Sequence, residues 1–183
     1  VISRRVGQVF RNYQISVSLG QIRSVRVYLT GYVKRPGVYT VGGLSSVVNA
    51  LMRSGGPASA GSLRSIELRR GKDTITRYDL YDLLLKGDRS ADRVVQNGDV
   101  IHVGPIGPQV ALVGSVNRPA IFEMKPGEKV ADIVAMAGGF TAVADRNRLA
   151  IERLDDRSKT RITQLSLPED SAQAPGSGDV LRA

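Results

Sequence analysis

Two arginines stand next to a proline and shortly before an aromatic residue, at two corresponding points of the chain. The residues are Arg35, Pro36 and Tyr39 at the first point and Arg118, Pro119 and Phe122 at the second. A guanidinium can bind the carboxylate of an acidic sugar, and an aromatic ring can stack on a sugar face. The same pattern suits a contact between subunits, or an arginine that keeps a turn soluble. The sequence leaves these three roles open.

A second group of basic residues comes later, around the end of a predicted strand. It consists of Arg64, Arg69, Arg70 and Lys72. On alternating strand positions, such side chains could line an anionic conduit or contact a glycan. As a solvated strand edge they would discourage edge-to-edge aggregation, which is the simpler interpretation.

Residues that could support catalysis or metal binding are few. The chain has no cysteine and a single histidine, His102, which cannot form a histidine-rich metal site. The closest carboxylate pairs, Asp79 with Asp82 and Asp155 with Asp156, have no histidine or lysine arranged for acid–base work. We expect them to serve turns and helix caps. The sequence therefore predicts no catalytic residue, no metal site and no cofactor.

The net charge of +9 is unevenly distributed over the 183 residues. Residues 1–104 hold 16 Lys and Arg against 7 Asp and Glu, whereas residues 105–183 hold 10 of each. The first part could attract an anionic partner, although a solvated surface also explains the excess. No apolar run approaches the roughly 20 residues that span a bilayer. The chain opens at Val1 without a recognisable signal peptide, so we expect it to be part of a longer protein.

An internal repeat with an offset of 83 residues organises the chain. Without gaps, residues 27–36 align with 110–119, 47–56 with 130–139, and 66–70 with 149–153; after about three deleted residues, 98–101 aligns with 178–181. Agreement of this length, with glycines and prolines in step, predicts two copies of one small domain.

Each copy reads as strand, strand, helix, strand, strand. Period-2 alternation predicts strands over 27–33 and 110–116, and the hairpins close with strands at 38–41 and 121–124. Apolar residues at helical spacing predict helices over 47–54 and 130–137, with Ser45 or Ser46 as one N-cap and residues 126–128 opening the second helix. Further strands are expected at 66–70, 75–78 and 100–103, with a helical turn at 80–86. The fold class is α+β, two tandem β-grasp domains, each a small twisted sheet packed on one helix.

Glycine and proline positions are expected to be structural. Gly55-Gly56 and Gly138-Gly139 follow the two helices, where a left-handed residue ends the helix, and no Gly-Lys-Ser/Thr accompanies them as a phosphate loop requires. Gly31 and Gly114 are expected to allow a helix to approach the sheet. Pro36 and Pro119 end the first strand of each copy, because proline cannot donate to the ladder.

Three segments divide the chain. Residues 1–24 carry an alternating pattern at Tyr13, Ile15, Val17 and Leu19, which predicts a strand of a preceding domain or one added to the first repeat. Residues 25–104 and 105–183 are the two repeats. The short linker at 104–108 contains two prolines, so the repeats are expected to keep a defined angle.

The motifs of both copies resemble a known family. Val-Tyr-Leu-Thr-Gly-Tyr-Val-Lys-Arg-Pro-Gly-Val-Tyr at 27–39, a helix, Gly-Gly and Asn-Gly-Asp-Val-Ile at 97–101 resemble the soluble-ligand-binding β-grasp (SLBB) domain. Two such domains, with Ser-Leu-Arg-Ser-Ile-Glu-Leu-Arg-Arg at 62–70, look like outer-membrane polysaccharide export proteins over residues 20–183. The second copy departs from the pattern at Ala120, where the first has Gly37, and in the polar stretch 168–178.

The resemblance implies a function in assembly rather than catalysis. Such proteins of Gram-negative bacteria form rings, often octamers, around a periplasmic cavity at the outer membrane. The implied partners are further copies of the chain, an anionic capsular polysaccharide or exopolysaccharide, and an inner-membrane polymerisation or co-export protein. A free-standing glycan- or solute-binding module and a DNA-binding uptake module remain alternatives. Nucleic acid is not the expected partner, because the aromatic residues fall in core-like hairpin positions.

Overall fold

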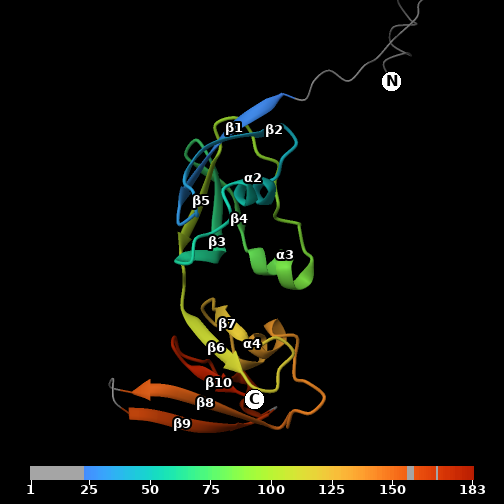
Figure 1. The fold of residues 1–183 in the computed structure, drawn as a ribbon, viewed down its shortest axis with the longest axis vertical. Helices are drawn as coiled ribbons and strands as arrows, with labels where there is room; N and C mark the ends of the chain where they lie inside the picture. The colour runs from blue at the N-terminus through green and yellow to red at the C-terminus, as the bar shows by residue number, and fades with distance from the viewer. Residues whose placement is uncertain (1–22, 156–158, 168) are drawn as a thin grey trace, which may run out of the picture.

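The computed structural model describes residues 23–155, 159–167 and 169–183. Each repeat forms one five-stranded mixed sheet with a helix packed on one face. In Figure 1 the two sheets follow each other along the long axis, with the first repeat in the upper half. The predicted α+β architecture of two tandem domains is confirmed.

The two repeats contain matching elements. The first comprises β1 (Ser24–Gly31), β2 (Gly37–Gly42), α2 (Val47–Arg53), β3 (Gly61–Arg70), β4 (Asp73–Tyr78), α3 (Leu80–Lys86) and β5 (Val100–Pro105). The second comprises β6 (Gln109–Val113), β7 (Ala120–Glu123), α4 (Val130–Met136), β8 (Arg148–Asp155), β9 (Lys159–Ser166), the 3₁₀ turn η1 (Glu169–Ala172) and β10 (Val180–Arg182). The predicted hairpins, helices and later strands are present at the expected places.

Both sheets have the same strand order. It is β2-β1-β5-β3-β4 in the first and β7-β6-β10-β8-β9 in the second. The first and last strands of each repeat pair in parallel, β1 with β5 and β6 with β10, and the other pairs are antiparallel. The inward side chains of the central strands meet the apolar face of the helix, as the period-2 and helical patterns require. Each repeat thus buries its own core.

Capping residues explain where the helices begin. Ser46 is the N-cap of α2 and accepts a hydrogen bond from the Asn49 N–H, which confirms one of the two predicted caps. Asp79 caps α3, as expected for this carboxylate. Helix α4 begins at Val130, later than the expected 126–128, and the Asp132 carboxylate accepts the Lys129 N–H there.

Strand β3 is longer than the sequence pattern indicates. It begins at Gly61, so Arg64 lies within the first half of the strand and not at the turn that follows it. Asp156 and the strand expected around 13–19 lie outside the described residues. Within the described part of the chain, no helix is long and apolar enough to cross a membrane, and no group of three or more His, Asp or Glu side chains could hold a metal ion.

Candidate functional site: the junction between the two repeats

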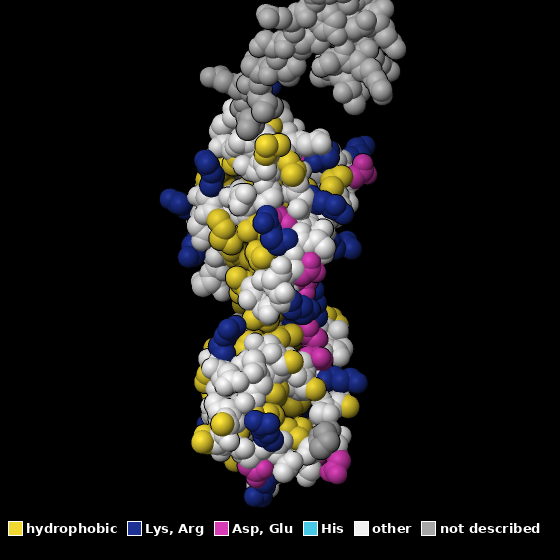
Figure 2. Space-filling model, turned by 90° about the vertical axis from the view of Figure 1, so that its right-hand side faces the viewer, with side chains coloured by type: hydrophobic (Ala, Val, Ile, Leu, Met, Phe, Trp, Pro, Cys, Tyr) yellow, Lys and Arg dark blue, Asp and Glu magenta, His cyan; other side chains and the backbone are white. Residues whose placement is uncertain are grey.

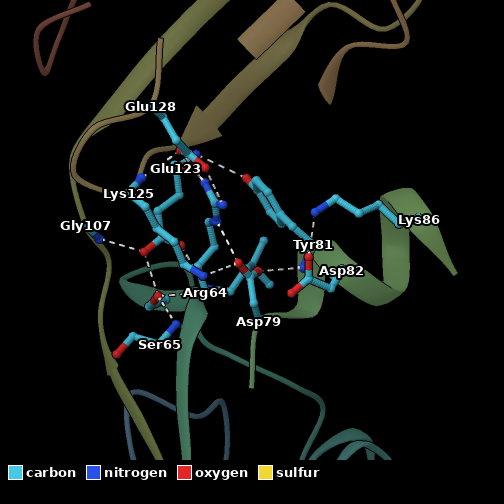
Figure 3. A network of polar contacts seen from close by, with 12 residues as sticks. Arg64, Ser65, Asp79, Tyr81, Asp82, Lys86, Gly107, Glu123, Lys125 and Glu128 are labelled. Atoms are coloured by element: carbon cyan, nitrogen blue, oxygen red, sulfur yellow. Dashed lines mark hydrogen bonds and ion pairs between the residues drawn. The ribbon is translucent and has the colours of Figure 1, made fainter. Parts of the chain in front are cut away.

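The most extensive polar network of the described residues lies where the two repeats meet. We call this region the junction; its polar members are Ser62, Arg64, Asp79 and Tyr81 of the first repeat and Gly107, Glu123, Lys125 and Glu128 of the second. Figure 3 shows the labelled members converging from β3, the start of α3, the linker, and the end of β7 with the loop that follows it. On the face seen in Figure 2, acidic side chains gather at the junction, about halfway along the molecule.

Arg64 is the centre of the junction. Its guanidinium donates two hydrogen bonds of 2.6 Å to the two carboxylate oxygens of Glu128 and one of 3.1 Å to Asp79. It also donates to the Glu123 carbonyl at 2.8 Å and lies 4.8 Å from the centre of the Tyr81 ring. The side chain is only 8% exposed. Its planar donor fork therefore binds Glu123 and Glu128 of the second repeat as well as Asp79 of the first.

Asp79 connects helix α3 to this centre. One carboxylate oxygen accepts the Tyr81 N–H at 2.9 Å, and the other is shared by Arg64 and Lys125, the latter at 2.6 Å. Burial opposes ionisation of this carboxyl group, but the hydrogen bonds from Lys125, the Tyr81 N–H and Arg64 outweigh it and lower its pKa. Asp79 is thus held as a carboxylate that joins both repeats.

Glu123 closes the other side of the junction. It is 5% exposed; one carboxylate oxygen accepts the Ser62 hydroxyl at 2.6 Å and the Gly107 N–H at 2.9 Å, and the other accepts the Leu63 N–H at 2.9 Å. Its own N–H donates to the Tyr81 hydroxyl at 3.1 Å. A single buried carboxylate therefore ties β3 and the linker to β7, while its backbone binds α3.

Apolar contacts accompany this network. Tyr81 belongs to the core cluster of the second repeat, and Leu63 and Leu85 pack against that cluster from the first repeat. Burial is the main cause that raises the pKa of the Tyr81 hydroxyl. Because polar and apolar groups are both shared, the junction fixes how the repeats are joined.

A cation cluster lies at the hairpin end of the first repeat. It consists of Lys34, Arg35 and Arg53. The Arg35 guanidinium donates to the Ser54 and Arg53 carbonyls at 3.4 and 3.3 Å, at the C-terminus of α2, and the Tyr39 hydroxyl donates to the Arg35 carbonyl at 2.7 Å. No ion pair involves these three cations within the described residues. Residues 1–66 contain no Asp or Glu at all.

The family match agrees with this repeated architecture. The SLBB domain model matches residues 26–79 and again residues 109–163. The chain belongs to the SLBB domain family. Its two copies correspond to the two sheets, and the resemblance expected from the motifs is confirmed.

Two curated relatives are similar to this chain over most of its length. The polysialic acid transport protein KpsD of Escherichia coli is 33% identical over 129 residues, which are 68% of this chain and 23% of KpsD. The EPS I polysaccharide export outer membrane protein EpsA of Ralstonia nicotianae is 30% identical over 158 residues, 83% of this chain and 41% of EpsA. The chain therefore spans less than half the length of these relatives, and their names describe transport and export proteins, not enzymes.

The predicted contact residues of the second SLBB repeat are not grouped as in the first. Arg118 is exposed, but Phe122 is only 4% exposed and belongs to the core. The Phe122 ring therefore has no free face for a sugar. In place of an arginine, the Asn117 side chain donates to the Gly138 carbonyl at 2.7 Å beyond the end of α4.

The other arginines of the predicted basic group are engaged with acids. Arg69 pairs with Glu67 at 2.6 Å, and Arg70 pairs with the fully buried Asp99 through two hydrogen bonds of 2.8 and 2.9 Å. Together with the buried Arg64, they do not form one continuous basic surface. An anionic conduit made of these three side chains has no support in this geometry.

The Arg70–Asp99 pair recurs in the second SLBB repeat as Arg153 with Asp179 at 2.8 and 2.6 Å. Each aspartate also accepts a backbone N–H three residues earlier, from Gln96 or Gly176. This pair was not predicted. The sequence did contain a signal for it, because the arginines match at an offset of 83 residues and both aspartates stand in a Gly-Asp-Val tripeptide at the last strand.

The repeated glycines have a different role from the one expected. Gly31 and Gly114 have φ values of +75° and +96°. A Cβ atom there would collide with the backbone carbonyl of Val103 or of Ala183, in or next to the neighbouring parallel strand. The close approach is thus between strands and not between helix and sheet. Gly55, Gly56, Gly138 and Gly139 all have positive φ, as expected after the helices. Pro36 and Pro119 were expected to end the first strands, but β1 already ends at Gly31 and β6 at Val113, and the prolines directly precede β2 and β7.

Proposed function

We propose that this chain is the tandem SLBB section of a polysaccharide export protein at the outer membrane of a Gram-negative bacterium, on the periplasmic side. It acts by assembling into a ring of identical copies and by docking onto an inner-membrane polymerisation or co-export protein. The observation that carries this proposal is the similarity to KpsD and EpsA, which extends over most of the chain. Catalysis has no part in it.

The cation cluster supports an anionic polysaccharide as the transported polymer. Lys34, Arg35 and Arg53 are exposed and lie in a region without carboxylates, so their field is not cancelled locally. Tyr39, half-buried beside them, adds a ring edge to the same surface. Guanidinium and ammonium groups would bind sugar carboxylates through charge-assisted hydrogen bonds.

The junction supports a function in assembly. A ring closes only if every copy presents its contact surfaces at the same angle. Arg64 and Glu123 join the repeats through buried hydrogen bonds, and Asp79 pairs with Lys125, so the two repeats of each copy would enter the ring as one rigid unit.

A binding titration tests the polymer part of the proposal. We expect the chain to bind polysialic acid more tightly than neutral dextran, with an affinity that falls steeply as salt is added. The double variant Lys34→Glu/Arg53→Glu should bind at least about tenfold more weakly, because two contacts change sign. Lys72→Glu/Lys159→Glu is the matched control, since it removes the same charge from exposed sites elsewhere.

Three results would contradict this assignment. They are equal binding of neutral and acidic polysaccharides, equal losses in both double variants, and tighter binding of single-stranded DNA than of polysialic acid. Arg35 is left unchanged in the test because it caps α2.

Imaging tests the assembly part. The full-length parent protein, extracted from outer membranes, should form closed rings in negative-stain electron microscopy. Monomers or dimers alone would contradict the ring.

A further inference from the structure

An apolar groove of about 340 Å³ runs along helix α4 of the second repeat. Its lining comes from α4, the segment before β8, the end of β9 and η1; the apolar members are Val130, Ala131, Val134, Ala135, Phe140 and Leu167. Arg146, Asn147 and Ser171 complete the lining. A surface of this kind, with few polar groups, is suited to receive apolar side chains.

The groove results from differences between the two repeats. On α2, the positions matching Ala131, Val134 and Ala135 hold the larger Val48, Leu51 and Met52. The connection over the helix is also shorter, since 21 positions lead from Tyr78 to Asp99 but only 14 from Leu165 to Asp179. Helix α3 of seven residues is accordingly replaced by η1 of four. The second repeat therefore leaves open a helix face that larger side chains occupy in the first.

The same repeat carries an exposed apolar tip. The β8–β9 hairpin pairs from Arg148 with Ser166 out to Asp155 with Lys159, so it extends beyond the shorter β3–β4 hairpin. Leu154 and Ile162 near its end are 63% and 66% exposed. Leu154 pairs with Thr160 and Ile162 with Glu152, which places both apolar side chains diagonally on one face of the hairpin.

Strand β8 places the tip and the groove on opposite sides of the domain. Asn147 of the groove comes directly before the strand, and Leu154 is its second-last residue. At 3.3 Å per residue, they are separated by roughly 20 Å along the strand. In Figure 1 the hairpin projects to the left, whereas α4 lies towards the other end of β8. A tip cannot reach the groove of its own domain, but it can reach that of another copy.

We propose that the apolar tip of one copy, Leu154 with Ile162, inserts into the α4 groove of a second copy. The contact is head-to-tail, because two different surfaces meet, and repetition of such a contact closes a ring when the rotation between copies allows it. The inference deepens the proposed function by naming the surface for self-assembly. Its complementarity rests on two features that are both absent from the first repeat, whose corresponding hairpin ends in Arg70, Gly71 and Lys72.

Cysteine cross-linking tests the contact directly, since the chain has no cysteine of its own. Leu154→Cys combined with Ala131→Cys in one chain should give a ladder of oxidised multimers at about 1 mM protein, where even millimolar contacts are populated. The control pair, Leu154→Cys with Val38→Cys, uses a residue of the first repeat that is 57% exposed. Equal yields from both pairs would overturn the proposal.

Blocking variants test the direction of the contact. Leu154→Asp removes the tip and Ala131→Trp fills the groove; each should weaken self-association in analytical ultracentrifugation at least about tenfold, because a buried aliphatic contact is lost. A mixture of the two variants should form 1:1 dimers, since one keeps its groove and the other keeps its tip. Val143→Trp, at a residue 89% exposed and outside the groove lining, is the control.

These outcomes distinguish a failure of the tip-and-groove contact from a failure of polysaccharide binding. If Ala131→Trp associates as strongly as Val143→Trp, or the mixture forms no heterodimer, the tip-and-groove contact is refuted. Neither measurement contains polysaccharide, so a failure of the cation cluster to bind polysialic acid would leave them unchanged. Rings of the full-length protein that survive Leu154→Asp would refute this contact while leaving the proposed ring intact.

Discussion

Replacing Arg64 with methionine removes the central donor of the junction while keeping a long, unbranched side chain. Removal of one partner from a buried ion pair typically costs about 3–5 kcal/mol. Asp79 keeps Lys125 and the Tyr81 N–H, and Glu128 keeps the Lys125 N–H. We therefore expect a loss near the lower end, about 3 kcal/mol of unfolding free energy.

Urea denaturation followed by circular dichroism measures this loss. Arg69→Met is the matched control, because Arg69 also pairs with a glutamate but its side chain is 48% exposed. An exposed pair of that kind contributes about 1 kcal/mol or less. Since each repeat has its own core, Arg64→Met should also broaden unfolding into two transitions, one for each repeat.

A double-mutant cycle tests whether the loss arises at the junction. Arg64→Met combined with Glu128→Gln should cost less than the sum of the single changes, by about 1–2 kcal/mol, because the two side chains share hydrogen bonds. A loss for Arg64→Met equal to that of Arg69→Met, or strict additivity with Glu128→Gln, would refute the assignment of Arg64 as the central connector.

Two further predictions concern the glycines and the buried acids. Gly31→Val should lower the unfolding free energy by at least about 2 kcal/mol, because valine adds left-handed backbone strain and collides with a strand carbonyl. Gly114→Val should lower it by less, because the carbonyl it meets belongs to Ala183 beside the short β10. Thermal melts measure both losses, with Gly71→Ala as the control, since Gly71 has φ +60° and open space around it. The pKa values of Asp79 and Asp179 are lowered from the ordinary 3.8. Their stabilisation is therefore present above pH 3.8 and is lost as the pH falls through the lower folded values. Unfolding free energies measured from pH 7 downward should decline below about pH 4, and a rise there would contradict the ion pairs.

Much of the fold could be predicted because the local patterns agree with each other. Alternation over 27–33, helical spacing over 47–54 and the Gly55-Gly56 stop each specify one element, and the second copy repeats them. Agreement between two copies helps to decide whether a short apolar run is a helix or a strand. Local patterns could not predict that β3 extends back to Gly61. The polar residues Ser62 and Arg64 are buried there by the other repeat, so this part of the strand shows no clear alternation of apolar and polar residues.

The junction could not be predicted from local patterns either, because its contacts join residues that are far apart in the sequence. Arg64 reads as a surface cation, and nothing within a few residues indicates that Glu128, 64 positions away, will bind it. Phe122 stands at a core-like hairpin position but also near Arg118, and only the register of β7 with β6, which sets it opposite Val110, decides that its ring is buried. Contacts between domains, and which face of a short strand is buried, depend on the tertiary structure and cannot be predicted from periodicity alone.

Sequence differences between the two repeats prevent the junction contact from recurring between copies of the chain. At an offset of 83, the position of Arg64 is occupied by Asn147 in the second repeat, and that of Glu128 by Ser45 in the first. A second copy stacking end to end in the same manner would therefore lack the central ion pair, so this contact does not propagate into a filament. The ring that we propose would therefore have to use another surface, such as the tip and groove of the second repeat. A rigid two-domain unit with lateral contacts is the geometry that a ring requires.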